Sequence, residues 1–312
     1  AFSVALYTPF GLSTEYDKDW VGRYQVQTAQ LKTLAISPAL AFELSDSVSA
    51  SVGLSAVRGQ TKLISAVDFG AVCFAAIGPA ACAGANLLPQ TQDGSARIDA
   101  EGNGVGWTAS AAWQASERLR FGLHLRSKID LDVSGDTSFR NPTLPGPFAA
   151  LTQTPATSNG GVSSTLVLPE IASAGLAFDI GASTELIADT TWTRWGRLQD
   201  LRLRFDNGAA DSVIAFGWKN TRKFGLGLNH RSSDRWQWKG GVEWESSAVS
   251  EANRNAIVPD SERVFVGGGF RYALADRRSV DVALGAIRFT RSRIDNTVAG
   301  AGRLRGDFAL DS

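Results

Sequence analysis

Apolar and polar residues alternate along the segment from Leu119 to Val133. The odd-numbered positions are apolar: Leu119, Phe121, Leu123, Leu125, Ile129, Leu131 and Val133. The even-numbered positions carry the ionisable residues Arg120, His124, Arg126, Lys128, Asp130 and Asp132. A period of two predicts a β-strand, and about fifteen residues exceed the roughly 5–6 that are usual in globular sheets. Because a dry core would not accept so many ionisable side chains, that face contacts water, in a lumen or in bulk solvent.

The same alternation returns in other segments, and tryptophans lie near the ends of their apolar faces. The apolar positions are Trp107, Ala109, Ala111 and Trp113, then Trp236, Trp238, Val242 and Trp244, and then Val264, Val266, Phe270 and Tyr272. Tryptophans at strand ends suit the aromatic girdles of a membrane barrel. These strands therefore favour a sheet with one lipid-facing surface.

Short and long connections also alternate along the chain. Short turns are predicted at 45–47, 115–117, 181–183, 232–234 and 275–277, and long connections at 11–28, 60–104, 134–163, 206–220, 247–261 and 293–302. This sorting is typical of outer-membrane barrels, where short turns are periplasmic and long loops extracellular. The sequence thus predicts an all-β fold, an antiparallel transmembrane β-barrel with about twelve strands, from 1–10 to 303–312.

Composition allows this interpretation without requiring it. The chain has 312 residues, 44% of them hydrophobic and 20% charged, with a net charge of +0 that gives no sign of a nucleic-acid partner. No run approaches the ~20 apolar residues of a membrane-spanning helix. Met is absent and both ends fall inside predicted strands. We therefore expect 1–312 to be one barrel domain that lacks sequence before its first strand and at the end of its last.

Two cysteines, Cys73 and Cys82, lie close together in a segment rich in Gly, Ala and Pro. A local disulfide fits an oxidising compartment, and the alternative is two unpaired small hydrophobic residues. Neither His124 nor His230 has a second ligand at a suitable spacing, so we expect no metal site. No cofactor motif is present, and no cofactor is expected.

Several short motifs, in their order and spacing, resemble the outer-membrane transporters for long-chain fatty acids and other hydrophobic compounds, the FadL type. They are Pro9-Phe10-Gly11-Leu12-Ser13-Thr14-Glu15-Tyr16, Asp19-Trp20-Val21-Gly22-Arg23-Tyr24, Gly102-Asn103-Gly104-Val105-Gly106-Trp107, Leu125-Arg126-Ser127-Lys128-Ile129, Leu168-Pro169-Glu170, Trp192-Thr193-Arg194-Trp195, Phe205-Asp206-Asn207, and Pro259-Asp260 before Arg263. The resemblance covers nearly the whole chain.

The resemblance implies a fourteen-stranded barrel in the bacterial outer membrane, crossed many times by the chain and plugged by an N-terminal hatch. The chain would then hold strands three to fourteen, without the hatch. It also implies passive uptake of fatty acids or aromatic hydrocarbons, with lateral exit at a kinked strand marked by Pro9, Phe10 and Gly11. From the residues alone, Pro9 and Gly11 could instead end a strand and begin a loop. Glycine at the kink would permit the backbone to depart and leave the opening clear.

In such transporters the first substrate contact is a groove between two extracellular loops, which correspond here to 60–104 and 134–163. Both loops are unusually apolar for exposed connections. The groove candidates are Phe74, Ile77, Leu87, Leu88, Phe139, Leu144, Phe148 and Leu151. The alternative is that these side chains only pack on each other and cap the barrel.

A fatty-acid carboxylate would need a cation beside apolar walls. The candidates are Arg58, Lys62, Arg126, Arg263 and Arg288. Each could equally be a lumen charge that is paired with an acid. Arg288 shares the apolar parity of Val280, Val282 and Leu284, which indicates a bulge or a position above the lipid band.

Two other functions compete with hydrophobic uptake. A general diffusion porin would need an open lumen, and the apolar loop 60–104 argues against it. A lipid hydrolase would need a Ser–His pair, and His124 and Ser127 have opposite parity on one strand. We therefore expect no enzyme, and partners limited to a hydrophobic ligand, outer-membrane lipid and lipopolysaccharide, with a monomeric barrel and no nucleic acid.

Overall fold

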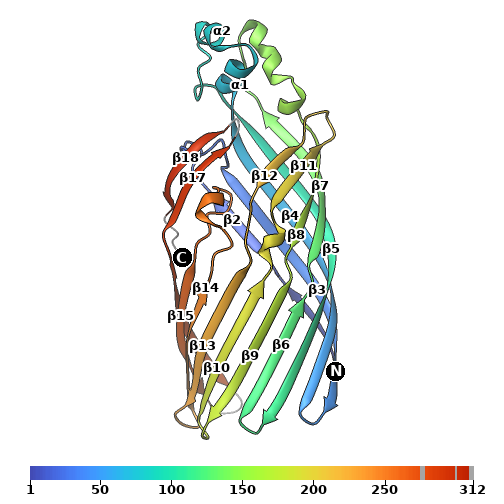
Figure 1. Ribbon diagram of the computed structural model, residues 1–312, viewed down its shortest axis with the longest axis vertical. Coiled ribbons are helices and arrows are strands. Elements are labelled where there is room, and N and C mark those ends of the chain that lie inside the picture. Colours follow the sequence, from blue (N-terminus) through green and yellow to red (C-terminus); the bar gives the residue numbers. More distant parts are fainter. Residues whose placement is uncertain (275–277, 299–300, 309–312) are drawn as a thin grey trace.

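The computed structural model describes residues 1–274, 278–298 and 301–308, and it is an antiparallel β structure. The lower wall in Figure 1 contains β1 (Phe2–Tyr7), β3 (Thr28–Ser45), β4 (Val48–Asp68), β5 (Asp93–Ser116), β6 (Leu119–Arg126), β9 (Ile171–Ile180), β10 (Thr184–Thr193), β13 (Thr221–Arg231), β14 (Trp236–Glu245), β15 (Arg263–Ala273) and β16 (Ser279–Phe289). The upper part adds β2 (Gly11–Glu15), β7 (Ile129–Arg140), β8 (Gly160–Leu168), β11 (Asp200–Phe205) and β12 (Ser212–Ala215). This arrangement confirms the predicted all-β barrel architecture.

The short turns gather at the lower end in Figure 1, and the long connections reach toward the upper end. Strands end and restart around the turns at 45–47, 115–117, 181–183 and 232–234, which confirms these four predictions. The turn predicted at 275–277 lies outside the described residues. These four described hairpins therefore point the same way, as the alternation of connection lengths requires.

The long connections are more regular than predicted. The segment 60–104, expected as a loop, is mostly the paired extensions of β4 and β5, which run to Asp68 and from Asp93. Likewise, β2 lies in 11–28, β12 in 206–220 and β17 (Ser292–Val298) in 293–302. Backbone pairing between the strands continues beyond the part of the wall with an apolar outer surface. The reason is that every backbone donor and acceptor left out of the ladder would need another partner.

The twelfth predicted wall strand, 303–312, is wrong in the part that the structure describes. There, β18 (Gly302–Phe308) pairs with β17 in a separate two-stranded sheet at the upper end (Figure 1). The period-two pattern could not distinguish these cases, because both a wall strand and a hairpin strand alternate. In the described sheet, β1 and β2 form an edge beside β3, β16 forms an edge beside β15, and β12 forms an edge beside β11.

The predicted strand from Leu119 to Val133 is broken after Arg126. The lower half of β5 pairs with β6, and its upper half pairs with β7. At the break, the Ser127 Oγ accepts a hydrogen bond from the Trp107 amide at 2.9 Å. A second break, at Pro169 and Glu170, separates β8 from β9. Above these breaks β8 pairs with β11 instead, so the wall bends and makes room for segments folded into the barrel.

The interior above the breaks is apolar. A buried cluster there consists of Ala35, Val57, Ala100, Ile129, Leu131, Val133 and Leu168. The opposite parity of the same strands carries exposed hydrophobic residues, such as Leu34 and Ile36 on β3 and Leu54 on β4. Lower down, that outward parity suits lipid and the inward parity forms the lumen.

Helices occupy the upper tip and the inward-folded segments. They are α1 (Phe69–Ala76), α2 (Pro79–Gly84) and the 3₁₀ turns η1 (Gly146–Thr152), η2 (Pro155–Thr157), η3 (Trp195–Arg197) and η4 (Glu251–Asn253). In the described part of the chain, no helix has the length and apolar character needed to cross a membrane.

Candidate functional site

The strand at the edge of the sheet is kinked at Phe10. Tyr7 on β1 faces Ala35 of β3, and Gly11 on β2 faces Lys32, so four steps on the edge strand match three on β3. The extra residue makes a β-bulge. The Phe10 amide donates to the Thr33 Oγ1 at 3.0 Å, and this hydroxyl donates to the Phe10 carbonyl oxygen. Thr33 thus replaces the ladder partners lost at the kink.

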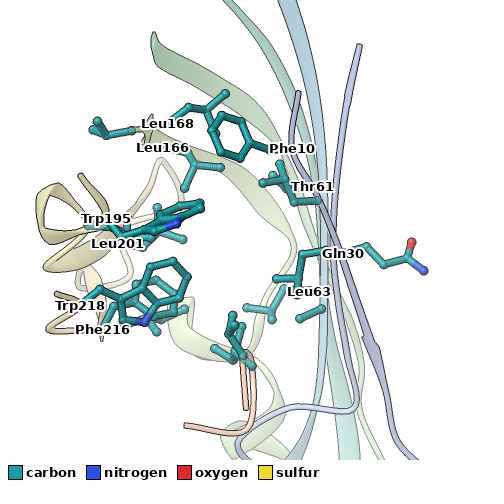
Figure 2. Close-up of a pocket in the computed structure, with 18 of the residues that line it drawn as sticks. Phe10, Gln30, Thr61, Leu63, Leu166, Leu168, Trp195, Leu201, Phe216 and Trp218 are labelled. Carbon is teal, nitrogen blue, oxygen red and sulfur yellow. The ribbon is translucent and has the colours of Figure 1, made fainter. Parts of the chain in front are cut away.

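Gly11 allows the kink without being sterically required for it. A Cβ at Gly11 would lie 4.0 Å from the nearest heavy atom outside its own neighbours, the Leu31 carbonyl oxygen. Gly11 pairs with Lys32, whose side is exposed, whereas Phe10 turns inward (Figure 2). Because β1 and β2 are an edge of the described sheet, the opening beside the kink has only one defined wall. The lateral exit therefore stays a prediction.

Behind the kink lies an apolar cavity of about 330 Å³, at the lower end of the ~300–1,000 Å³ that small-molecule sites usually have. Figure 2 shows Thr61 and Leu63 on one side, Trp195, Leu201, Phe216 and Trp218 on the other, and Phe10, Leu166 and Leu168 at one end. One side belongs to wall strands, and the other to the segment between η3 and β13. This cavity, with the kink, is the candidate site.

The inward-folded side is an aromatic cluster of edge-on and tilted rings. Phe10 meets the Trp195 ring edge-on with centroids 5.4 Å apart, and Trp195 meets Trp218 at 5.1 Å. Phe216 lies 5.2 Å from Trp218. Such contacts add about 0.5–1.5 kcal/mol per pair beyond the burial of area. The aromatic cluster therefore links the kinked strand to the opposite side of the cavity.

Polar contacts hold the aromatic segment in place. The Arg197 Nε donates to Glu170 at 2.7 Å, at the break between β8 and β9. The Gly196 amide donates to the Asn220 Oδ1 at 3.0 Å, and the Gln199 Nε2 donates to the Trp218 carbonyl oxygen at 2.9 Å. The first bond ties the segment to the wall, and the other two join its beginning to its end, so they restrain Trp195 and Trp218.

Arg263 lies at the cavity boundary and is already neutralised. Its Nη2 is 2.7 Å from the Glu245 Oε2, and its Nη1 is 3.2 Å from the Asp260 Oδ1. Asp260 also accepts a hydrogen bond from the Ser247 hydroxyl at 2.9 Å. Two carboxylates around one cation leave this group of side chains with a net negative charge, which disfavours a third carboxylate beside it.

Arg126 has the opposite character. It is only 9% exposed, and its Nε and Nη2 have no hydrogen-bond partner. Its guanidinium carbon lies 4.5 Å from the centroid of the Phe10 ring, which lines the cavity, and its side chain interacts with the Tyr7 hydroxyl. Of the cations proposed from the sequence, it is the one that is buried beside the cavity without a counter-charge among the described residues.

The remaining candidate cations have other surroundings. Arg58 lies on the exposed face of β4 and pairs with Glu101 at 2.7 Å, and its role in carboxylate binding stays a prediction. Lys62 contributes to the cavity lining but alternates with the inward-facing Thr61 and Leu63. Arg288 is exposed opposite the outward Val264, in a ladder without a register shift. It lies on the outer surface, not at a bulge, because strand parity cannot reverse without an extra residue.

The residues proposed for a loop groove mostly pack against each other. Leu87, Leu144 and Leu151 are buried in one cluster with the two cysteines, and Phe74 and Phe148 pack against it. Ile77 and Leu88 remain 48% and 40% exposed, and Phe139 lies outside this cluster. These contacts are the ones that the packing alternative requires, and ligand capture at this tip stays a prediction.

Cys73 and Cys82 form a disulfide between α1 and α2, with Cα atoms 6.0 Å apart. The disulfide closes a short loop and so lowers the conformational entropy of the unfolded chain. In this entropic description it stabilises the folded tip by about 2–3 kcal/mol. We expect the Cys73→Ser/Cys82→Ser variant to be cleaved by protease between α1 and β5 at least tenfold faster than the wild type, with an unchanged barrel midpoint of thermal unfolding. Limited proteolysis with mass spectrometry measures the first, and a fall in the barrel midpoint would contradict the local role.

His124 and Ser127, the two residues considered for hydrolase chemistry, are not hydrogen-bonded to each other. The His124 Nδ1 is 2.9 Å from the Ser110 Oγ, while the Ser127 Oγ donates to the Lys128 carbonyl oxygen at 3.0 Å. Within the described chain, His124 has no hydrogen bond to a carboxylate that would orient it as a general base.

The aromatic side of the cavity was missed in the sequence. Phe216 and Trp218 lie in the predicted long connection 206–220, and Trp195 was noted only as part of a motif. The signal that singled out 60–104, large apolar residues in an extracellular connection, applies to 206–220 as well. Applying it there would have indicated these residues.

Comparison with known proteins agrees with this architecture. The family model described as "Outer membrane protein transport protein (OMPP1/FadL/TodX)" matches residues 1–311. The long-chain fatty acid transport protein of Escherichia coli K12 is 25% identical over 300 residues, covering 91% of this chain and 66% of that protein. The chain thus spans about two thirds of the length of the curated relatives it matches.

Solved structures show the same fold. A Pseudomonas aeruginosa FadL homologue superposes with a TM-score of 0.86 at 21% identity, covering 98% of this chain and 71% of that one. The Pseudomonas putida toluene transporter TodX superposes with a TM-score of 0.64 at 14% identity, covering 98% and 75%. With a family model matched along nearly its whole length, the chain belongs to the OMPP1/FadL/TodX family of outer membrane transport proteins and is an outer-membrane β-barrel.

Proposed function

We propose that the protein carries hydrophobic compounds passively across the outer membrane. The observation that carries this proposal is the apolar cavity directly behind the kinked strand, built by Trp195, Trp218 and leucines from both sides. Apolar walls exclude ordered water and favour hydrocarbon by about 25 cal/mol per Å² of buried apolar surface. No described group near the cavity suggests coupling to an energy source, so net transfer follows the gradient.

The proposed route has three stages. A ligand meets the apolar tip formed by α1, α2 and η1, where Ile77 and Leu88 are exposed. It then enters the cavity and leaves sideways at Pro9, Phe10 and Gly11, into the surrounding outer-membrane lipid and lipopolysaccharide. Two relatives support the choice of cargo by their names, one a long-chain fatty acid transport protein and the other a toluene transporter.

A reconstitution assay separates this function from a general diffusion porin. The full-length protein in liposomes is expected to accelerate uptake of oleate or toluene at least tenfold over protein-free liposomes, while liposome swelling in glucose stays at the background rate. Equal acceleration for glucose would favour the porin, whose polar solutes have no use for an apolar cavity. No acceleration for either hydrophobic probe would contradict the proposal.

A further inference from the structure

Three cations lie close together on β3 and β4. Lys32 is directly opposite Gln60 in the register, and Arg58 and Lys62 lie two positions to either side of Gln60 on β4. Because residues along a strand are about 3.4 Å apart and neighbouring strands about 4.8 Å apart, the Cα atoms of Arg58 and Lys62 are each about 8 Å from that of Lys32. Three long side chains at this spacing can reach one small anion.

All three cations belong to the outer face of the wall. Lys32 and Arg58 are exposed, while the residue that follows each of them along its strand is buried. Figure 2 shows Gln30, the residue opposite Lys62, pointing away from the cavity. Because directly opposite residues of an antiparallel pair share one face, Lys62 is directed outward as well.

The same outer face becomes apolar toward the short turns. Leu34 is opposite Arg58, and Ile36 on β3 and Leu54 on β4 follow, all three exposed. Trp107 on β5 pairs with Leu54, as in the aromatic girdle at the edge of the lipid-facing band. The chain is an outer-membrane barrel, and the cations lie on the side of its long, extracellular connections. They therefore lie where the head groups of the outer leaflet begin.

The charges of these cations are only partly compensated. The acids on β5 are already paired, Glu101 with Arg58 at 2.7 Å and Asp99 with Arg97 at 3.0 Å. The other described acids of this face are more distant, at the upper end of β2 and on β7, two strands away from β4. The two lysines have no hydrogen bond or ion pair with any described residue. An anion from outside the chain is therefore needed to balance them.

A phosphate group that is attached to acyl chains fits these features. Lysine and arginine bind phosphate oxygens through charge-assisted hydrogen bonds, and the exposed leucines and isoleucine beside them can contact hydrocarbon. Lipopolysaccharide, the phosphorylated glycolipid of the outer leaflet, supplies both groups in one molecule. Free phosphate would gain nothing from the apolar side chains, and an uncharged lipid would leave the lysines uncompensated.

We propose that Lys32, Arg58 and Lys62 bind a phosphate group of lipopolysaccharide, whose acyl chains then lie along Leu34 and the apolar outer face next to it. Lys32 pairs with Gly11, so the bound lipid lies beside the outer surface of the kinked strand. The site uses the opposite face of the strands that line the cavity, and it does not depend on which compound the protein carries.

The test measures binding of two lipids to the purified full-length protein in an uncharged detergent: lipid A with both phosphate groups, and the same lipid A with its phosphates removed. The wild type is expected to bind the phosphorylated form about tenfold more tightly, or better. Lys32→Gln/Lys62→Gln is expected to weaken binding of the phosphorylated form by about 10- to 30-fold, since each lysine near an anionic surface contributes about fivefold. Binding of the dephosphorylated form should change less than about twofold.

The matched control is Arg118→Gln/Arg235→Gln, which removes two exposed cations at the short turns, at the other end of the wall. It is expected to bind both lipids as the wild type does. An equal loss in this control, or an equal loss of both lipids in the lysine variant, would show a general charge or folding effect and contradict the site. So would a wild type that binds the two lipids equally.

Two further measurements complete the test. Inorganic phosphate in excess, at matched ionic strength, is expected not to displace lipid A, and displacement would assign the lysines to a free anion instead. Because Lys62 is half-buried, the fully exposed Lys32 also provides a single variant that is safe for folding. Lys32→Gln alone is expected to weaken binding of phosphorylated lipid A by about fivefold, and unchanged binding would overturn the proposal.

Discussion

Filling the cavity from both sides is expected to reduce uptake of hydrophobic compounds at least tenfold. Leu63 on β4 and Leu201 on β11 face each other across the cavity in Figure 2, and both line it. The double variant Leu63→Trp/Leu201→Trp places two indole rings in a space of about 330 Å³. On the proposed route the ligand occupies this space before it reaches the kink, so the variant should block transfer while leaving the lower barrel wall intact.

The matched control for this variant carries two tryptophans on the outward parity. Leu54 on β4 and Leu226 on β13 are 62% and 64% exposed, so Leu54→Trp/Leu226→Trp adds the same side chains where they meet lipid. Uptake of oleate and toluene into liposomes is measured for both variants, after a heat-induced mobility shift confirms folding. Overpacking costs about 1–3 kcal/mol per site, which a barrel can tolerate. Normal uptake by the filled variant would show that ligands take another route.

The second large effect concerns the contact between β5 and β7. Gly102→Ala is expected to lower the free energy of unfolding by about 3 kcal/mol or to prevent folding. A Cβ at Gly102 would lie 1.9 Å from the Asp132 carbonyl oxygen, and one at Gly135 would lie 2.0 Å from that of Asp99. These are backbone atoms in a paired ladder, so the strands themselves must separate to admit a methyl group.

Gly122→Ala is the control for the glycine effect. Gly122 lies on β6 in the same sheet, and a Cβ there would meet nothing within 4 Å. Because Ala restricts the unfolded chain more than Gly does, this variant should be neutral or slightly stabilised. Urea unfolding in lipid vesicles, followed by tryptophan fluorescence, measures both variants. Similar stability for Gly102→Ala and Gly122→Ala would mean that β5 and β7 adjust without cost.

Both predictions depend on features that alternation alone does not reveal. The pattern from Leu119 to Val133 shows two faces but not the break after Arg126, because Ser127 and Lys128 keep the parity on each side. The break directs β6 to β9 and β7 to β8, and this change of partner opens the interior for the segment that carries Trp195. Each strand could pair with any of several distant segments. The local alternation of apolar and polar residues does not show which of them becomes its partner.

The sequence by itself determined the barrel wall and its hairpins. Side chains that alternate with a period of two, short turns and long connections are local properties, and the motifs around Gly11 indicate the family from sequence alone. The two cysteines predicted their own disulfide, because only nine positions separate them. For these features, neighbouring residues are enough to fix the structure.

The tertiary structure alone decided which charges matter. The sequence does not distinguish three of the candidate cations. In the structure Arg58 faces outward, Arg126 is buried without an anion, and Arg263 lies between two carboxylates. The cavity likewise arises where β3 and β4 meet the segment around Trp218, which follows them by more than a hundred positions. Burial, pairing and charge compensation depend on distances between remote segments, and only the folded chain sets those distances.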